Sequence, residues 1–204
     1  MSTSTEKQDV IEVGPPDGAP VLLLHSWWGR RPAVLEWAEG LAATGRRVVV
    51  PDLFDGATAD TEEAAKALLP TVDWALLERC VTELAGQGRP WAVVGFSMGA
   101  MYASLLAGRP EGGPDEVVLF YGGCAPAAGG PGPRRAEVHH VQGDDFFTAE
   151  EIAETQEGFR AAGAEVVSYE YPGGRHWFAE RGTPGFDEDA FALALSRVAG
   201  GLGA

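Results

Sequence analysis

Positive charge is scarce in this chain of 204 residues. Acidic residues number 30 against 15 basic ones, which gives a formal net charge of −15, and the lysines are Lys7 and Lys66 alone. Such a surface repels phosphate backbones, so nucleic-acid binding is not expected. It also gives no broad attraction for anionic substrates, so a substrate carboxylate would need one local arginine.

Cysteines and long apolar runs are equally scarce. Cys80 and Cys124 are too few for a disulfide framework and suit a reducing compartment, where each is expected to be a small buried hydrophobe. No stretch reaches the length of a membrane span, and the polar N-terminus lacks the apolar segment of a signal peptide. We therefore expect a cytoplasmic protein that forms one domain over residues 1–204, with residues 1–8 as a flexible tail.

Apolar runs alternate with helical patterns along the chain. Strands are predicted at 21–25, 46–53, 91–94, 116–121, 137–142 and 165–171, with an early edge strand at 8–13. Helices are predicted at 33–44, 61–69, 72–85, 98–108, 149–162 and 187–201. This alternation predicts an α/β fold, a doubly wound and mostly parallel sheet with helices on both faces. No link between strands is long enough for a large lid.

The segment WAVVGFSMGA (91–100) predicts a strand, a sharp turn and a helix, with Ser97 at the apex of the turn. Flanking Gly95 and Gly99 form a G-x-S-x-G nucleophile elbow, in which a strained serine hydroxyl is lifted out of the sheet. The backbone N–H of Met98 would then help to stabilise an oxyanion. A serine that only caps the helix would not require glycine on both sides.

A general base and an orienting carboxylate follow in the order expected for this elbow. His176, in the glycine-rich segment YPGGRHWF, is the predicted base, because that turn lets a side chain approach the serine from another loop. Asp145 is the predicted carboxylate that orients the imidazole, and its neighbour Asp144 is the alternative. Asp52 precedes Ser97 and is interpreted as a structural anchor.

Three other histidines compete for the role of the base. His139 and His140 lie within a predicted strand and are expected to be packed on opposite faces of the sheet. His25 ends a strand, where a structural hydrogen bond is the better interpretation.

The loop after the first buried strand, Ser26-Trp27-Trp28-Gly29, is expected to complete the site. The backbone N–H of Trp27 is the predicted second oxyanion donor. Arginines on neighbouring loops are candidates for binding a substrate carboxylate with two parallel hydrogen bonds. The predicted substrate-binding residues are Ser26, Trp28, Arg30, Tyr121, Trp177 and Arg181.

Four segments resemble the dienelactone hydrolase family of α/β hydrolases: VLLLHSWWG, VVVPDLF, GFSMGA, and HVQGDDF with RHWFAER. The resemblance covers nearly the whole chain and implies the α/β-hydrolase fold without a large lid. The best-known members carry a cysteine where this chain has Ser97, and a glutamate where it has Ser26. The family's substrate-binding arginine falls at Glu180. The resemblance with these changes implies a serine hydrolase.

The prediction is a serine hydrolase that cleaves small carboxylic esters or lactones through an acyl-enzyme intermediate. No metal or cofactor is implied by any motif. A thioesterase, amidase or peptidase with the same residues is the nearest alternative, and a non-catalytic ligand-binding protein is another. A dehalogenase or epoxide hydrolase would need aspartate at position 97. A monomer is expected, with a homodimer as the alternative.

Overall fold

A seven-stranded sheet organises the computed structural model, which describes residues 9–203. Its strands are β1 (Val10–Val13), β2 (Pro20–Leu24), β3 (Arg47–Pro51), β4 (Ala92–Phe96), β5 (Glu116–Phe120), β6 (Arg135–His140) and β7 (Glu165–Glu170). They are arranged in the order β1-β3-β2-β4-β5-β6-β7. Only β1 pairs antiparallel, at one edge, and the predicted doubly wound sheet is confirmed. The predicted tail, residues 1–8, lies outside the described residues.

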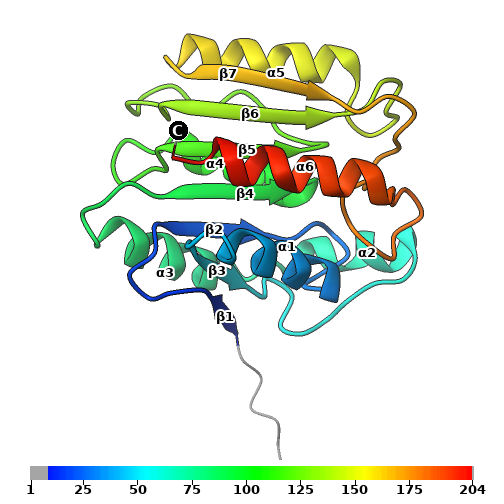
Figure 1. The fold of residues 1–204 in the computed structure, drawn as a ribbon, viewed down its shortest axis with the longest axis horizontal. Coiled ribbons are helices and arrows are strands. Elements are labelled where there is room, and N and C mark those ends of the chain that lie inside the picture. Colours follow the sequence, from blue (N-terminus) through cyan, green and yellow to red (C-terminus); the bar gives the residue numbers. More distant parts are fainter. Residues whose placement is uncertain (1–8, 204) are drawn as a thin grey trace, which may run out of the picture.

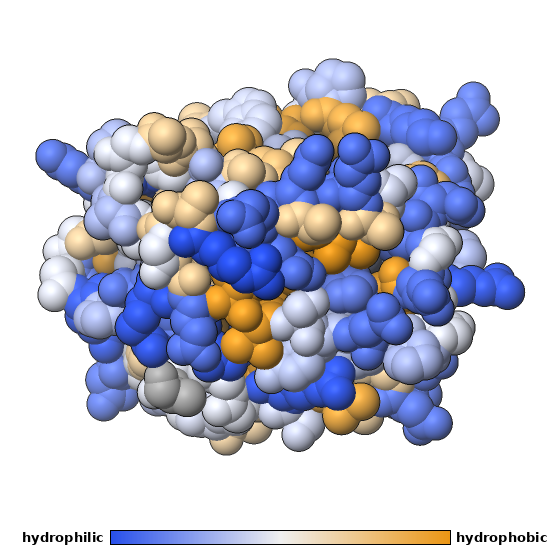
Figure 2. All heavy atoms as spheres, turned by 90° about the horizontal axis from the view of Figure 1, so that it is seen from above, coloured by the Kyte–Doolittle hydropathy of each residue, from blue (hydrophilic) through white to orange (hydrophobic). Residues whose placement is uncertain are grey.

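The middle of the sheet is the most apolar part of the chain. Every residue of β2, β4 and β5 is buried, as expected for strands that are covered on both faces. In contrast, the edge strand β7 alternates exposed and partly buried residues. Figure 2 views the molecule from the side of β7 and α5, where hydrophilic residues surround small separate apolar patches. Such an edge has little apolar surface for pairing with another chain.

Helices cover both faces of the sheet. They are α1 (Pro32–Ala42), α2 (Glu62–Leu68), α3 (Trp74–Ala85), α4 (Met98–Ala107), α5 (Ala149–Ala161) and α6 (Glu188–Gly201), and a short 3₁₀ turn spans Leu69–Thr71. α1 and α6 lie side by side on the near face in Figure 1, and α3 and α4 lie behind the sheet. All predicted helices are present, with ends shifted by one or two residues. Within residues 9–203, no helix is both long and apolar enough to cross a bilayer.

The carboxyl ends of the parallel strands meet at one edge of the sheet, on the right in Figure 1. Phe96 of β4 is in register with Phe120 of β5, which in turn is in register with His139 of β6. The loops that begin after these strands therefore start side by side. Ligand sites of open parallel sheets form at this edge, because loops from separate parts of the chain meet there.

The two cysteines differ in their surroundings. Cys80 is buried in α3, as expected, and burial raises the pKa of its thiol to about 11. Cys124 is only partly buried, so the expectation of a buried residue is wrong for it. Its backbone N–H donates to Ser104 Oγ, and desolvation raises the pKa of its thiol as well. A raised pKa keeps both thiols protonated and poorly nucleophilic at neutral pH.

Candidate active site

Ser97 occupies a strained turn between β4 and α4. Its backbone has φ of 50° and ψ of −107°, a conformation that side-chain-bearing residues rarely adopt. A Cβ at Gly95 would lie 2.3 Å from the carbonyl oxygen of Gly99, and a Cβ at Gly99 would lie 2.3 Å from that of Leu24. Both glycines are therefore required by close backbone contacts.

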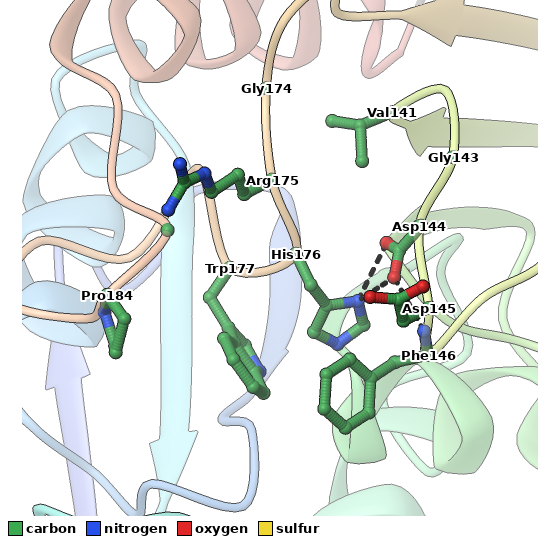
Figure 3. A pocket seen from close by; sticks show the side chains of 11 residues that line it. Val141, Gly143, Asp144, Asp145, Phe146, Gly174, Arg175, His176, Trp177 and Pro184 are labelled. Atoms are coloured by element: carbon green, nitrogen blue, oxygen red, sulfur yellow. Dashed lines mark hydrogen bonds and ion pairs between the residues drawn. The ribbon is translucent and has the colours of Figure 1, made fainter.

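A chain of hydrogen bonds links three loops at this edge. Ser97 Oγ lies 3.1 Å from His176 Nε2, and His176 Nδ1 lies 2.9 and 2.8 Å from the two carboxylate oxygens of Asp144. Because a carboxylate only accepts hydrogen bonds, Nδ1 carries the proton and Nε2 is left free to accept the serine hydrogen. Figure 3 shows the imidazole with its Nδ1 facing Asp144. The arrangement is that of a nucleophile, a base and an orienting carboxylate.

The carboxylate that contacts His176 is Asp144, so the expectation for Asp145 is corrected. Asp144 is buried, and its Oδ1 also accepts the backbone N–H groups of Phe146 and Phe147, at 2.8 and 3.2 Å. These bonds close a turn that holds the Asp144 side chain inward. Asp145, one residue further along, is exposed to solvent and lines the adjoining cavity.

Strained backbone conformations are concentrated in the loops around Ser97 and His176. Among residues 9–203, four non-glycine residues have positive φ, and three of them belong to the site: Ser97 at 50°, Tyr121 at 38° and Trp177 at 65°. They come from the loops after β4, β5 and β7. Such conformations persist only where the surrounding structure enforces them, and they are common at functional sites.

The predicted oxyanion donors lie on adjoining segments. Met98 is the first residue of α4, where backbone N–H groups have no acceptor within the helix. Trp27 follows the end of β2 in a turn closed by the hydrogen bond from Gly29 N to Ser26 O, 3.1 Å long. The close approach of Gly99 to Leu24 brings the start of α4 against the end of β2. The two N–H groups are thus carried by neighbouring pieces of backbone.

Aromatic rings surround the imidazole. Trp27 and Trp177 are stacked with ring centroids 5.6 Å apart, and Phe146 lies 4.9 Å from His176 and 5.0 Å from Trp177. A cavity of about 360 Å³ adjoins the Asp144 side of His176 and is lined by Phe146, Trp177 and the loops at 141–145 and 174–185 (Figure 3). Its lining is mixed, since Asp144, Asp145 and Arg175 stand beside the aromatic rings, and a pocket of this kind suits a small organic molecule.

Several predicted substrate-binding residues do not face a substrate. Ser26 and Tyr121 are fully buried, and Trp28 is packed into the core. The guanidinium of Arg30 bonds to Asp52 and the carbonyl oxygen of Val50, at 3.3 and 3.1 Å. Within the predicted group, Trp177 is the one that lines the cavity beside His176.

Arg181 also lies outside the site. Its guanidinium contacts Glu36 and Glu188 at distances of 2.6 to 3.3 Å on the surface between α1 and α6. These two carboxylates occupy its hydrogen-bond donors and raise its pKa, so the arginine forms surface ion pairs and has no donor turned to the site. The interpretation of Arg30 and Arg181 as substrate ligands is therefore not supported by their positions.

Glu180 was not predicted to contribute to the site. This residue follows His176 in the same loop and is 2% exposed. Its Oε1 accepts from Ser26 Oγ at 2.7 Å and its Oε2 accepts from the Tyr121 hydroxyl at 3.0 Å. Burial raises the pKa of Glu180 to about 7, against the opposing effect of these two hydrogen bonds. The only signal in the sequence was that a glutamate stands where the family has an arginine.

His25 and His139 are buried and bond to groups other than Ser97, as expected, whereas His140 is only partly buried, so the expectation that it is packed is wrong. His25 Nδ1 donates to the carbonyl oxygen of Ser26 at 2.7 Å, and its Nε2 accepts from the backbone N–H of Leu53 at 3.0 Å. Burial lowers the pKa of His25 to about 4, so the ring is neutral. His139 is buried within β6, and His140 bonds to Ser168. Within the described chain, no three His, Cys, Asp or Glu side chains are grouped for a metal ion.

Several solved structures resemble this chain in fold. Solved structures that align over most of the chain include a candidate dienelactone hydrolase from Klebsiella pneumoniae, with 18% identity, a TM-score of 0.71, and 93% of this chain and 90% of the other covered. The thioesterase domain of the curacin biosynthetic pathway aligns with 20% identity, a TM-score of 0.63 and 93% of each chain covered.

A thermophilic esterase from Thermogutta terrifontis, bound to propionate, aligns with 14% identity, a TM-score of 0.63, and 93% of this chain and 88% of the other covered. These likenesses show the α/β-hydrolase fold. Among curated proteins, none matches the sequence. The profile of the dienelactone hydrolase family matches residues 10–203. The chain therefore belongs to the dienelactone hydrolase family.

Proposed function

We propose that this hydrolase cleaves carboxylic esters or lactones through a serine nucleophile. The observation that carries the proposal is the hydrogen-bonded series from Ser97 Oγ through His176 to Asp144, with Ser97 on a strained elbow at the start of α4. In this proposal Ser97 is the nucleophile, His176 the general base and Asp144 the group that fixes the imidazole tautomer.

The reaction would run in two halves. His176 Nε2 takes the hydroxyl proton as Ser97 Oγ bonds to the carbonyl carbon, and the backbone N–H groups of Met98 and Trp27 would stabilise the resulting oxyanion. The intermediate then collapses, the bond to the alcohol oxygen breaks, and His176 returns its proton to that oxygen. Water, deprotonated by His176, attacks the acyl-enzyme and releases the acid and free Ser97.

The surroundings of the proposed nucleophile favour small substrates. The cavity beside His176 has a volume of about 360 Å³ and opens to solvent without a covering domain. Arg175 lines this cavity and is the arginine placed to meet a charged acyl chain, because Arg30 and Arg181 are engaged elsewhere. Short-chain or aromatic esters are expected to react faster than long-chain lipids, because the cavity is small.

A matched substrate panel tests the proposal. Hydrolysis of an ester, its thioester and its amide with the same acyl group would be measured for wild type and Ser97→Ala, together with labelling by a fluorophosphonate. The ester should turn over and wild type alone should be labelled. A preference for the thioester would favour the activity named for the curacin domain. Labelling of both proteins alike, with no turnover, would favour a ligand-binding role.

A further inference from the structure

One buried carboxylate joins three of the loops that form the site. Glu180 lies four positions after His176, on the loop that follows β7. It accepts a hydrogen bond from Ser26, on the loop after β2, and another from Tyr121, on the loop after β5. These loops are far apart in sequence and are held together beneath the site by this single side chain.

Each partner of Glu180 touches the proposed machinery. Ser26 immediately precedes Trp27, and its hydroxyl oxygen also accepts the backbone N–H of Trp28 at 3.3 Å. The conformation of residues 26–29, here called the oxyanion loop because it carries the proposed donor Trp27 N–H, thus depends on the position of the Ser26 hydroxyl. The Tyr121 ring lies 5.0 Å from the His176 ring, and its backbone is strained with φ of 38°. Because the two rings pack against each other, a shift of Tyr121 would displace the imidazole.

The electrostatic setting of Glu180 is unusual. Its carboxylate accepts from two neutral hydroxyls, and the cation that acts on it is Arg31, whose guanidinium lies 3.6 Å from Asp60. The other titratable groups nearby are Tyr121, whose pKa burial raises, and Asp144, which acts on Tyr121. His25, beside Ser26, is neutral because its pKa is lowered, and the adjacent Arg181 is engaged with Glu36 and Glu188.

Ionisation changes what Glu180 can hold. As a carboxylate it accepts from both hydroxyls at once. As a carboxylic acid it gains an O–H donor that needs an acceptor of its own, so the pattern of two incoming hydrogen bonds is disturbed. The burial-raised pKa of about 7 places this change within the physiological range.

We propose that Glu180 is a positioning residue for hydrolysis, which holds the oxyanion loop through Ser26 and supports the imidazole through Tyr121 only while it is ionised. This inference rests on the proposed function, because it assigns Glu180 to the geometry needed for turnover. It predicts an acid-side ionisation in the pH dependence of kcat/KM that is lost when Glu180 is replaced.

The pH dependence of kcat/KM separates this role from a merely structural one. For wild type, log(kcat/KM) should fall toward low pH with a limiting slope about one unit steeper than for Glu180→Gln, because Glu180 must be deprotonated. Glu180→Gln should fold. At high pH its kcat should be about tenfold lower with KM nearly unchanged, since the amide accepts fewer hydrogen bonds and does not touch substrate. Exposed Glu154→Gln is the matched control and should keep the wild-type profile.

Hydrogen exchange gives a readout that does not need activity. Exchange rates would be corrected for the pH dependence of intrinsic exchange. In wild type, the amides of residues 26–29 should then lose protection below pH 7, and in Glu180→Gln their protection should not change over this pH range. If wild type and Glu180→Gln have the same pH profiles of hydrogen exchange and of kcat/KM, Glu180 has no positioning role, even if the protein is an active hydrolase. If wild type neither turns over ester nor reacts with a fluorophosphonate, the proposed function fails, whereas the exchange step still decides whether Glu180 positions the loop.

Discussion

Asp144–His176 and Glu137–His139 are both carboxylate–histidine pairs, yet their surroundings differ. In the first, the imidazole stands on a loop at the carboxyl edge of the sheet, with Nε2 3.1 Å from Ser97 Oγ. In the second, the imidazole is buried within β6, and its two nitrogens contact Glu137 and the Tyr171 hydroxyl at 3.2 and 2.8 Å. Arg135 also contacts Glu137, at 2.9 Å.

The difference shows that the pair alone does not make a base. Burial lowers the pKa of His139, and both of its nitrogens are occupied by groups that do not react with substrate. His176 places its Nε2 on the strained Ser97, and its ring lines a cavity that opens to solvent. The access of the imidazole to solvent and the identity of its third partner therefore separate the two pairs. The first three predictions below change one pair while the other stays intact.

Replacing the two histidines should give opposite results. His176→Gln is expected to lower kcat/KM for ester hydrolysis by about 10⁴-fold or more with little loss of stability, because the proton acceptor is removed. His139→Gln should keep kcat/KM per folded molecule within about twofold. Steady-state kinetics and thermal unfolding of both variants are the measurements. Equal losses of activity would contradict the distinction between the pairs.

Two neighbouring aspartates give the next test. Asp144→Asn should lower kcat by about 10³- to 10⁴-fold, because an amide stabilises the wrong imidazole tautomer. Asp145→Asn removes an exposed charge and should change kcat by less than about threefold. Rate measurements on the two variants check this, and a larger loss for Asp145→Asn would restore the sequence-based assignment.

The buried pair should matter for stability. Glu137→Ala leaves Arg135 without its closest carboxylate and is expected to lower the free energy of unfolding by about 3 kcal/mol. Activity of the folded protein should stay unchanged, because Glu137 does not touch the site. Urea unfolding measures the loss, with exposed Glu154→Ala as a control that should change it by less than about 0.5 kcal/mol. A Glu137→Ala protein of wild-type stability would show that the buried pair contributes nothing.

The contribution of Glu180 to the free energy of unfolding should depend on pH. Its folded-state pKa of about 7 lies above the ordinary 4.5, so the folded state binds its proton more tightly than the unfolded state. Stability from this group is therefore highest below pH 4.5 and declines as the pH rises to 7. The Tm of wild type minus that of Glu180→Gln should fall by roughly 10 °C over this interval. Calorimetry at several pH values measures it, and a constant difference would show that the pKa of Glu180 is unchanged by folding.

The sequence predicted the fold well, because apolar runs and helical spacing are local properties. β2, β4 and β5 were recognisable as continuous apolar strands, and the elbow around Ser97 by its glycines. That the chain forms one domain stays a prediction. The choice between Asp144 and Asp145 could not be made from sequence, because it depends on a turn closed by the N–H groups of Phe146 and Phe147.

The surroundings of the site were harder to predict. Glutamates are rarely buried, so nothing local marked Glu180 as lying beneath three loops. Arg181, its neighbour, had the right residue type for a substrate ligand but lies on the surface against Glu36 and Glu188. Tyr121 was expected at the substrate and is instead buried with its hydroxyl on Glu180. These positions are set by contacts between loops that are distant in sequence.

The central claim is that Ser97 attacks the carbonyl carbon with His176 as its base. Mass spectrometry of peptides from an acid-quenched reaction with a slowly hydrolysed aryl ester tests it most directly. The account predicts one acyl group on the peptide that contains Ser97 in wild type, and none in Ser97→Ala or His176→Gln. Turnover of the ester by Ser97→Ala at the wild-type rate, or an acyl group on another residue, would contradict it.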